Sequence, residues 1–351
     1  MRTKKSRFIT NTVTYAVLIA IFILFTIMIN HKTMPRTLKG QLVPICAWIV
    51  MAVSLNLVVG ISGELSLGHA GFMSIGAFTG IIISGWLLNG FQMENGSLRL
   101  VIAIVGAGLV SGIAGALIGI PVLRLRGDYL AIVTLAFGEI IKNLINCLYV
   151  AVEDKGLNVG FLNNNVAGTM LLNGPMGAVK VKTISTFTAG FLLVMFTLII
   201  VLNLTNSRSG RAIMAARDNR IAAEATGINI TKYKMIAFVT GAFLAGMAGA
   251  LYGLNMAKLG PTKFSFNESI NVLVFVVLGG IGSIPGSIVS AVALTILPEE
   301  LRFLQENRML AYAVLLIVVM LLVNNPLMKS LWGRLNPFKK RHKEQEEVIR
   351  T

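Results

Sequence analysis

The sequence predicts an all-α polytopic membrane protein with about ten transmembrane helices. Hydrophobic residues make up 55% of the chain and charged residues only 13%, and the mean hydropathy is +0.77. Apolar runs of about 20 residues, the length that crosses a bilayer, recur along the whole chain. Lys and Arg gather at the chain ends and in the connections between these runs, which is typical of the cytosolic side of membrane proteins.

The net charge of +16 does not indicate a nucleic-acid-binding protein. The basic residues are divided among the ends and short connections and do not form one continuous binding face. A soluble protein of this composition would have too little polar surface. The sequence therefore excludes nucleic acid as a partner and makes the lipid bilayer the expected surroundings.

The predicted spans begin directly after the basic segment MRTKKSRFIT. We interpret the first one as an uncleaved span, because its apolar core is too long for a signal peptide and no small-x-small cleavage site follows. Its basic residues Arg2, Lys4, Lys5 and Arg7 are expected in the cytosol. The predicted spans are residues 13–30, 41–60, 71–88, 100–121, 129–149, 184–204, 235–254, 269–282, 285–298 and 309–323.

The eighth and ninth spans are short, and the stretch Ile270–Leu297 could instead be one span interrupted at Gly279–Gly286. Ten spans place both termini in the cytosol, whereas nine would place a strongly basic C-terminal tail outside, against the positive-inside bias. Ten spans are therefore preferred, with a transmembrane domain over residues 1–328 and a cytosolic basic tail over residues 329–351. Three basic residues in the first outer loop count against this topology: Lys32, Arg36 and Lys39.

The segment Ser207–Lys234 is the longest polar interruption that carries a dense set of basic side chains. We expect it to lie in a cytosolic loop over residues 205–234. Helical spacing of its apolar positions predicts a short amphipathic helix, and Gly227 lies where a helix C-cap would end it. The loop is either a docking element for another protein or a solvated connection that only sets the topology.

The longest outer loop, Val150–Thr183, is rich in Asn and Gly. This composition predicts turns and a surface loop. Such a long loop is a candidate surface for a partner protein, the alternative being a connection without a partner.

Within the spans, small residues recur at helix-packing spacing and predict close helix contacts. They are Gly76 and Gly80; Gly108, Gly112, Gly115 and Gly119; and Ala242, Gly246, Gly249 and Gly253.

No motif in the sequence supports catalysis. The chain has no G-x-x-x-x-G-K-[ST] phosphate loop, no G-x-S-x-G elbow and no H-E-x-x-H helix. We therefore predict no catalytic residue, no metal site and no cofactor of its own, and the chain cannot hydrolyse ATP by itself. Cys46 and Cys147 lie in apolar runs, where cysteine behaves as a small hydrophobic residue.

Two polar patches interrupt the spans. In the first, Glu139, Lys142 and Asn143 lie within the predicted fifth span, where charges normally face a bundle interior or a water-filled cavity. They form either the polar wall of a pathway or a local ion pair that packs helices. The second, LNLVVGISGELSLGHAGF, combines glycines with polar residues, and non-helical backbone at membrane depth must line a cavity or be buried in protein. Its polar residues are Asn56, Ser62, Glu64, Ser66 and His69.

Four ordered segments carry a family resemblance, and they extend over most of the chain. They are SLNLVVGISGELSLGHAGFMSIGAFTG, GDYLAIVTLAFGEIIKNL, GRAIMAARDNRIAAEATGINITKYKMIAFVTGAFLAGMAGALYG and FSFNESINVLVFVVLGGIGSIPGS. Together they resemble the permease subunits of branched-chain amino-acid ABC importers, in particular the LivM type.

The resemblance implies a type II ABC importer fold in a bacterial cytoplasmic membrane. It also implies a heterodimer with a second permease subunit, two cytosolic ABC ATPases that bind the ATP, and an extracytoplasmic binding protein that delivers leucine, isoleucine or valine. In such importers the cytosolic loop carries an EAA-x3-G-like signature. Here Ala222, Ala223 and Gly227 match it, Ile221 replaces the Glu, and the usual I-x-L-P downstream is absent.

By this resemblance we expect four residues to couple the chain to an ATPase: Arg217, Asp218, Glu224 and Gly227. The expected lining of the translocation path is Asn56, Glu64, His69, Glu139 and Asn143. Two alternatives remain. A permease of the same family could import urea, short amides or a sugar, and an ion-coupled secondary transporter would use buried ion ligands at broken helices.

Overall fold

The computed structural model describes residues 15, 19–20, 22–29, 35–125, 127–153, 156–162, 168–179, 181–301 and 307–324. The basic N-terminal segment and the predicted tail 329–351 lie outside this part of the chain. The chain divides into two compact units, Met1–Val292 and Ala293–Thr351. The second unit contains the C-terminal half of α11 (Ile284–Glu300) and the apolar helix α12 (Arg308–Asn324).

Helices dominate the structure, as predicted for a polytopic membrane protein. Every predicted span from residue 41 onward overlaps a helix, although the predicted fifth span 129–149 ends in the first two residues of a strand that begins at Leu148, and residues 22–29 of the first span are helical. The first unit contains α2 (Arg36–Asn56), α3 (His69–Asn89), α4 (Gly96–Val122), α5 (Asp128–Asn146), α6 (Phe187–Asn206), α9 (Ile230–Gly253) and α10 (Phe266–Gly279). Among the described residues, five helices are long and apolar enough to cross a bilayer, and two apolar helices are shorter. The number of ten crossings stays a prediction.

The core of the first unit is built around α9, which packs against α2, α3 and α4. Its small residues permit close approach of the neighbouring backbones. A Cβ atom on Gly249 would lie 2.0 Å from the Met73 carbonyl oxygen of α3. Ser111 of α4 donates to the Ala242 carbonyl of α9 at 2.8 Å. Because lipid supplies no hydrophobic drive between helices, this close packing and hydrogen bonding hold the bundle together, and the predicted small-residue contacts are confirmed.

The prediction of an all-α protein is wrong in the segment that follows α5. A three-stranded antiparallel sheet with the order β2-β1-β3 forms there, and β4 pairs with β5. The bounds are β1 (Leu148–Glu153), β2 (Gly156–Phe161), β3 (Thr169–Asn173), β4 (Ala178–Val179) and β5 (Lys258–Leu259). The strands are short and separated by Gly and Asn, so composition indicates turns, whereas pairing between strands buries Val150 and Leu172.

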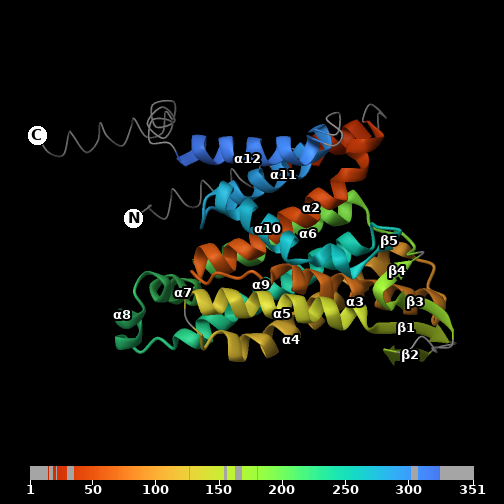
Figure 1. The fold of residues 1–351 in the computed structure, drawn as a ribbon, viewed down its shortest axis with the longest axis horizontal. Helices are drawn as coiled ribbons and strands as arrows, with labels where there is room; N and C mark the ends of the chain where they lie inside the picture. The colour runs from red at the N-terminus through yellow and green to blue at the C-terminus, as the bar shows by residue number, and fades with distance from the viewer. Residues whose placement is uncertain are drawn as a thin grey trace, which may run out of the picture. The chain divides into compact units, whose positions relative to one another are not determined.

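The polar segment after α6 contains two helices where one was predicted. They are α7 (Arg208–Asp218) and α8 (Arg220–Ala225). The break is at Asn219, which has an extended backbone and accepts a hydrogen bond from the Ala222 N–H at 3.0 Å, so that it caps the start of α8. Within the first unit, α7 and α8 lie at one end of the long helices and the strands lie at the other (Figure 1).

Candidate functional site

The chain has two glycine-rich breaks, and they meet in the structure. We call Leu55–Phe72 the first break and Gly279–Gly286 the second break. The first contains a π-helical turn, Leu57–Ile61, that continues α2, and such turns are frequent at functional sites. Asn56 Oδ1 accepts a hydrogen bond at 2.9 Å from the Gly282 N–H in the second break. A Cβ atom on Gly60 would lie 2.4 Å from the Gly282 nitrogen, so only glycine permits this approach.

Arg217 joins α7 to the first break. Its Nη1 donates to the Gly60 carbonyl at 2.8 Å, while Nε and Nη2 donate to Asp218 Oδ1 at 3.0 and 2.8 Å. Its aliphatic stem lies against Gly63, where a Cβ atom would be 2.5 Å from Arg217 Cγ. One side chain thus connects the basic segment to the membrane helices, with its charge balanced by a neighbouring carboxylate.

Glu64 forms an ion pair with Lys234, near the start of α9, and both side chains are nearly buried. This contact is a second connection between the first break and the end of the basic segment. The structure therefore gives Glu64 a partner that is 170 residues away in the sequence.

The C-terminus of α8 has the cap that the sequence predicts at Gly227. Gly227 adopts φ +81°. Its N–H donates to the Glu224 carbonyl at 2.9 Å, and the Ile228 N–H donates to the Ala223 carbonyl at 3.1 Å. These two bonds define a Schellman motif, which requires a left-handed residue at the glycine position. Ile228 packs on a small cluster formed by Ala216, Ala223 and Ile230, which fixes α8 against α7 and α9.

The outer side of α8 is exposed. Glu224 pairs with Arg220 across one helical turn at 3.0 Å. Ile221, which stands where the family signature has Glu, is 81% exposed. Exposure of one apolar side chain is ordinary on a protein surface, so it is the place of Ile221 in the family signature that makes it a candidate contact. The sequence contained a signal for this position, because Ile221 departs from the signature while the neighbouring alanines keep it.

The remaining predicted path residues occupy two places. His69 is buried and its Nε2 lies 2.8 Å from the Ser54 hydroxyl, between α2 and α3. Glu139 forms an ion pair with Lys142 and accepts a hydrogen bond from the Phe266 N–H at the start of α10. Asn143 is exposed on α5. The five residues thus do not converge on one cavity within this chain.

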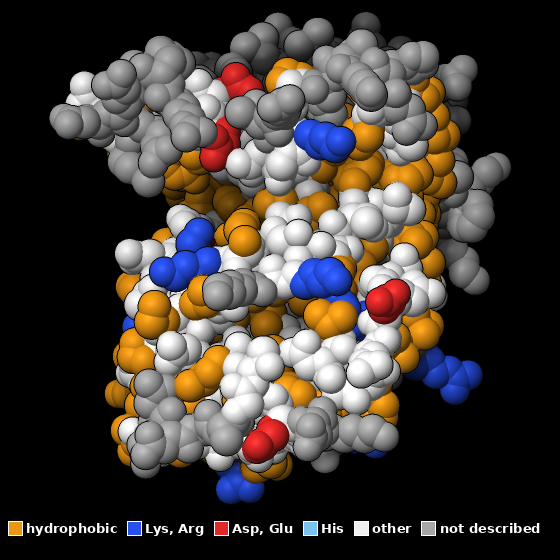
Figure 2. Space-filling model, turned by 90° about the vertical axis from the view of Figure 1, so that its right-hand side faces the viewer, with side chains coloured by type: hydrophobic (Ala, Val, Ile, Leu, Met, Phe, Trp, Pro, Cys, Tyr) orange, Lys and Arg blue, Asp and Glu red, His pale blue; other side chains and the backbone are white. Residues whose placement is uncertain are grey.

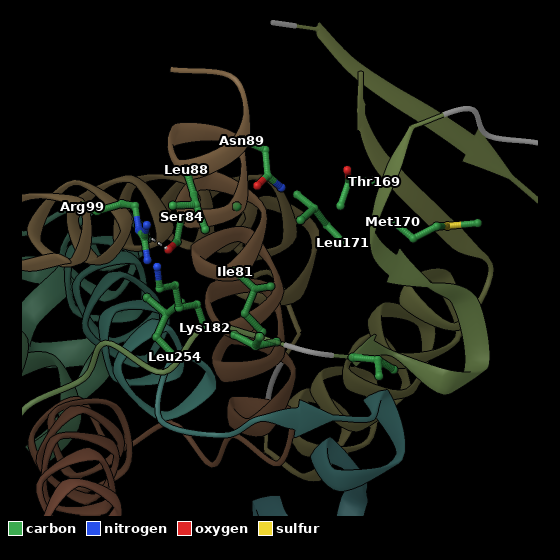
Figure 3. A pocket seen from close by; sticks show the side chains of 13 residues that line it. Ile81, Ser84, Leu88, Asn89, Arg99, Thr169, Met170, Leu171, Lys182 and Leu254 are labelled. Carbon is green, nitrogen blue, oxygen red and sulfur yellow. Dashed lines mark hydrogen bonds between the residues drawn. The ribbon is translucent and has the colours of Figure 1, made fainter. Parts of the chain in front are cut away.

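A cavity of about 210 Å³ lies at the strand end, between α3, α4 and β3. Arg99, Lys182 and Ser84 are among its lining residues. Figure 3 shows the Arg99 guanidinium and its hydrogen bond to Ser84 at one side of this cavity. Sequence reasoning missed Arg99, because the predicted fourth span began at residue 100 and left the arginine in a solvated connection.

Comparison with known proteins decides the family. Residues 38–323 match the family described as branched-chain amino acid transport system / permease component. The chain belongs to this permease family. The resemblance inferred from the sequence motifs is therefore confirmed.

The relatives include proteins named as high-affinity branched-chain amino acid transport system permease proteins. The chain is 36% identical over 288 residues to LivM of Salmonella typhimurium and 34% identical over 308 residues to LivM of Escherichia coli. In each case 78% of this chain and 66% of the relative are covered, so the chain spans slightly less than two thirds of these relatives. It is 25% identical to LivH of Escherichia coli, covering 78% of this chain and 89% of that protein. No solved structure matches.

Proposed function

We propose that this permease is a transmembrane subunit of an ATP-driven importer for leucine, isoleucine and valine in a bacterial cytoplasmic membrane. The family and the names of its relatives support this proposal. The chain is similar to both LivM and LivH of Escherichia coli, which supports a translocation path formed with a second, related permease subunit. In this proposal two cytosolic ATPases bind and hydrolyse ATP, and an extracytoplasmic protein delivers the amino acid.

The proposed topology places α7 and α8 in the cytosol, because their segment is rich in Arg and Lys. The strands then face the outside, where a binding protein arrives. Both termini are cytosolic with ten crossings, and residues 1–328 form the transmembrane domain with the tail 329–351 in the cytosol. The transported amino acid passes between the two permease subunits, so that path residues of this chain can be exposed when it is seen alone.

The single observation that carries the coupling proposal is the contact of Arg217 with Gly60. An ATPase docked on α8, with Ile221 inserted between its side chains, moves α7 and α8 when ATP closes the ATPase dimer. Arg217 transmits this movement to the π-helical turn, and Asn56 transmits it from there to the second break at Gly282. Asp218 holds the guanidinium in position, and the Gly227 cap holds α8 on α7.

The proposed lining of the path is Asn56, Glu64, His69, Glu139 and Asn143. Asn56 offers the clearest polar group, because its Nδ2 is buried without a partner among the described residues. An unpaired buried amide costs free energy, and a passing carboxylate would satisfy it in one state of the transport cycle. The path needs only weak polar contacts, since the binding protein supplies selectivity.

The test is uptake of labelled leucine and labelled urea in a host that expresses this chain with its genomic neighbours. Leucine uptake that requires the ATPases supports the proposal. Uptake of urea without uptake of leucine would contradict the proposed substrate class, while the proposed coupling to the ATPases would still hold. Uptake of leucine that persists without the ATPases would contradict the role of α7 and α8 and indicate an ion-coupled transporter.

A further inference from the structure

Arg99 is a buried cation whose partners in the described part of the chain are neutral. The residue is 1% exposed. Its Nε donates to Ser84 Oγ at 3.1 Å and its Nη1 donates to the Met93 carbonyl at 3.4 Å. A guanidinium has five N–H donors, so several of them stay available. In the described part of the chain, no Asp or Glu forms an ion pair with Arg99, although a buried charge is costly unless it is paired.

The position of Arg99 in its helix adds to this positive potential. It lies in the first turn of α4, which begins at Gly96. The macrodipole of a helix favours negative charge at this end and disfavours a cation. Burial and helix position therefore both indicate that the site is completed by an anion.

Lys182 is a second cation at the same cavity. Its segment is fixed by hydrogen bonds from the Val181 N–H to the Ala257 carbonyl and from the Ile184 N–H to the Leu254 carbonyl, each 3.1 Å long. Among the described residues that line the cavity, none carries a carboxylate. Figure 2, which looks at the strand end, shows basic side chains among hydrophobic ones over the middle of this face.

The rest of the cavity wall is mainly aliphatic. Ile81, Leu88, Leu171 and Leu254 contribute to it, and Figure 3 shows them around the space next to Arg99. The volume of about 210 Å³ lies below the range of about 300 to 1,000 Å³ that is typical for drug-sized ligands. The cavity thus combines two cations with an apolar wall on the scale of a small aliphatic molecule.

We propose that this cavity binds the carboxylate of a small aliphatic acid, with the carboxylate on Arg99 and Lys182 and the hydrocarbon part on the leucine side chains. The inference rests on the proposed function in one respect: a branched-chain amino acid is such a carboxylate, and the cavity is then its first binding site on the permease. The lining offers the ammonium group only neutral acceptors such as Asn89 and Thr169. The carboxylate therefore contributes most of the affinity.

The experiment measures binding to the permease–ATPase complex in phosphatidylcholine nanodiscs, without ATP and without the binding protein. Equilibrium dialysis compares labelled leucine, 4-methylpentanoate, which lacks the ammonium, and leucinamide, which lacks the carboxylate. We expect 4-methylpentanoate to bind within about threefold of leucine, and leucinamide to bind about tenfold more weakly, since a hydrogen bond from a guanidinium to a carboxylate is stronger than one to a neutral amide. Equal binding of leucine and leucinamide would overturn the proposal.

Variants locate the binding. Arg99→Gln is expected to weaken leucine binding about tenfold or more. Because Arg99 is buried and that variant can fail to assemble, Lys182→Gln provides a second test at an exposed position, with an expected loss of about threefold. The matched control is Lys258→Gln, which removes an exposed cation on β5 outside the cavity lining. Unchanged binding in an assembled Arg99→Gln or Lys182→Gln complex would overturn the assignment.

Further outcomes distinguish a free carboxylate from a lipid phosphate as the bound anion. They also distinguish a failure of this inference from a failure of the proposed function. If nanodiscs with phosphatidylglycerol reveal lipid bound at Arg99 while no free carboxylate binds in phosphatidylcholine, the site takes a phosphate headgroup and the proposal is wrong. ATP-dependent leucine uptake without leucine binding at the cavity contradicts this inference alone. Leucine binding at the cavity without any ATP-dependent uptake contradicts the proposed function alone.

Discussion

The two ends of the first unit each use an arginine, but in opposite electrostatic settings. At the α7 end, Arg217 donates to the Gly60 carbonyl and is paired with Asp218. At the strand end, Arg99 is buried and its partners are neutral. A cation that a carboxylate of the same chain neutralises can hold two segments of that chain together. A cation that its own chain leaves unpaired is suited to an external anion.

The largest effect on stability and transport is expected from a substitution at Gly60, where the first break contacts both Arg217 and the second break. Gly60→Ala would place a Cβ atom 2.0 Å from Asn56 Oδ1 and 2.4 Å from the Gly282 nitrogen. Overpacking of this kind costs about 1–3 kcal/mol. We expect a lower thermal stability of the complex and loss of leucine uptake, measured by a melting assay in detergent and by transport in cells. Gly40→Ala, on the same helix α2, is the matched control, because nothing lies within 4 Å of that position. Equal behaviour of the two variants would contradict the contact between the breaks.

Arg217→Gln tests the connection itself. The variant loses the charge-assisted bond to Gly60, so ATP-dependent uptake should fall about tenfold. Copurification of the ATPases should stay unchanged, because the proposed docking residue Ile221 is intact. Arg211→Gln is the control, because it removes a nearby exposed cation whose side chain, among the described residues, donates to the Asn206 carbonyl. A parallel loss of ATPase binding in Arg217→Gln would make Arg217 part of the docking surface and not of the connection.

Ile221→Ala tests the docking surface of α8. Because Ile221 is 81% exposed, the substitution should change the stability of the chain by less than about 0.5 kcal/mol. Removal of a buried contact in the complex should nevertheless weaken ATPase binding several-fold, as measured by copurification at graded salt and detergent concentrations. Ala225→Ser, on the same helix, is the control. Wild-type ATPase binding by Ile221→Ala would show that α8 docks through other residues.

Glu139→Gln sharpens the contrast between paired and unpaired cations and is expected to have the smallest effect. It removes the charge that neutralises Lys142 and keeps an acceptor for the Phe266 N–H. Partly exposed ion pairs contribute about 0–1 kcal/mol, so assembly should be unaffected. If Glu139 lines the path as proposed, leucine uptake decreases by about threefold in transport assays. Unchanged uptake and assembly would leave Glu139 as a local packing contact.

Much of the fold could be predicted from local sequence. Apolar runs of span length specify their helices without help from other segments, because every backbone group in lipid must find a partner within its own helix. The αL position at Gly227 could also be predicted from local sequence, since the cap depends on residues within one turn. The small residues facing α9 indicated where helices come close, although they did not indicate which helices meet.

The strands, the split helix and the connections between distant segments could not be predicted in this way. The strand β1 becomes regular only by pairing with β2 and β3, and its short alternation is too weak to stand out among Gly and Asn. Asn219 ends α7 and caps α8 through a local bond from the Ala222 N–H, but the spacing of Ala216 and Ala223 continues one helical pattern across it, so the pattern predicted a single helix. The contacts of Asn56 with Gly282 and of Arg217 with Gly60 join residues separated by 226 and 157 positions.

The sequence by itself thus predicted the family, the long apolar helices and the basic segment that the proposal assigns to an ATPase. Only the tertiary structure decided which charges are neutralised and which are not. The physical reason is that the state of a charge depends on its burial and its neighbours in space. The same residue type therefore serves as a paired connection at Arg217 and, among the residues that the structure describes, as a buried cation without a carboxylate partner at Arg99.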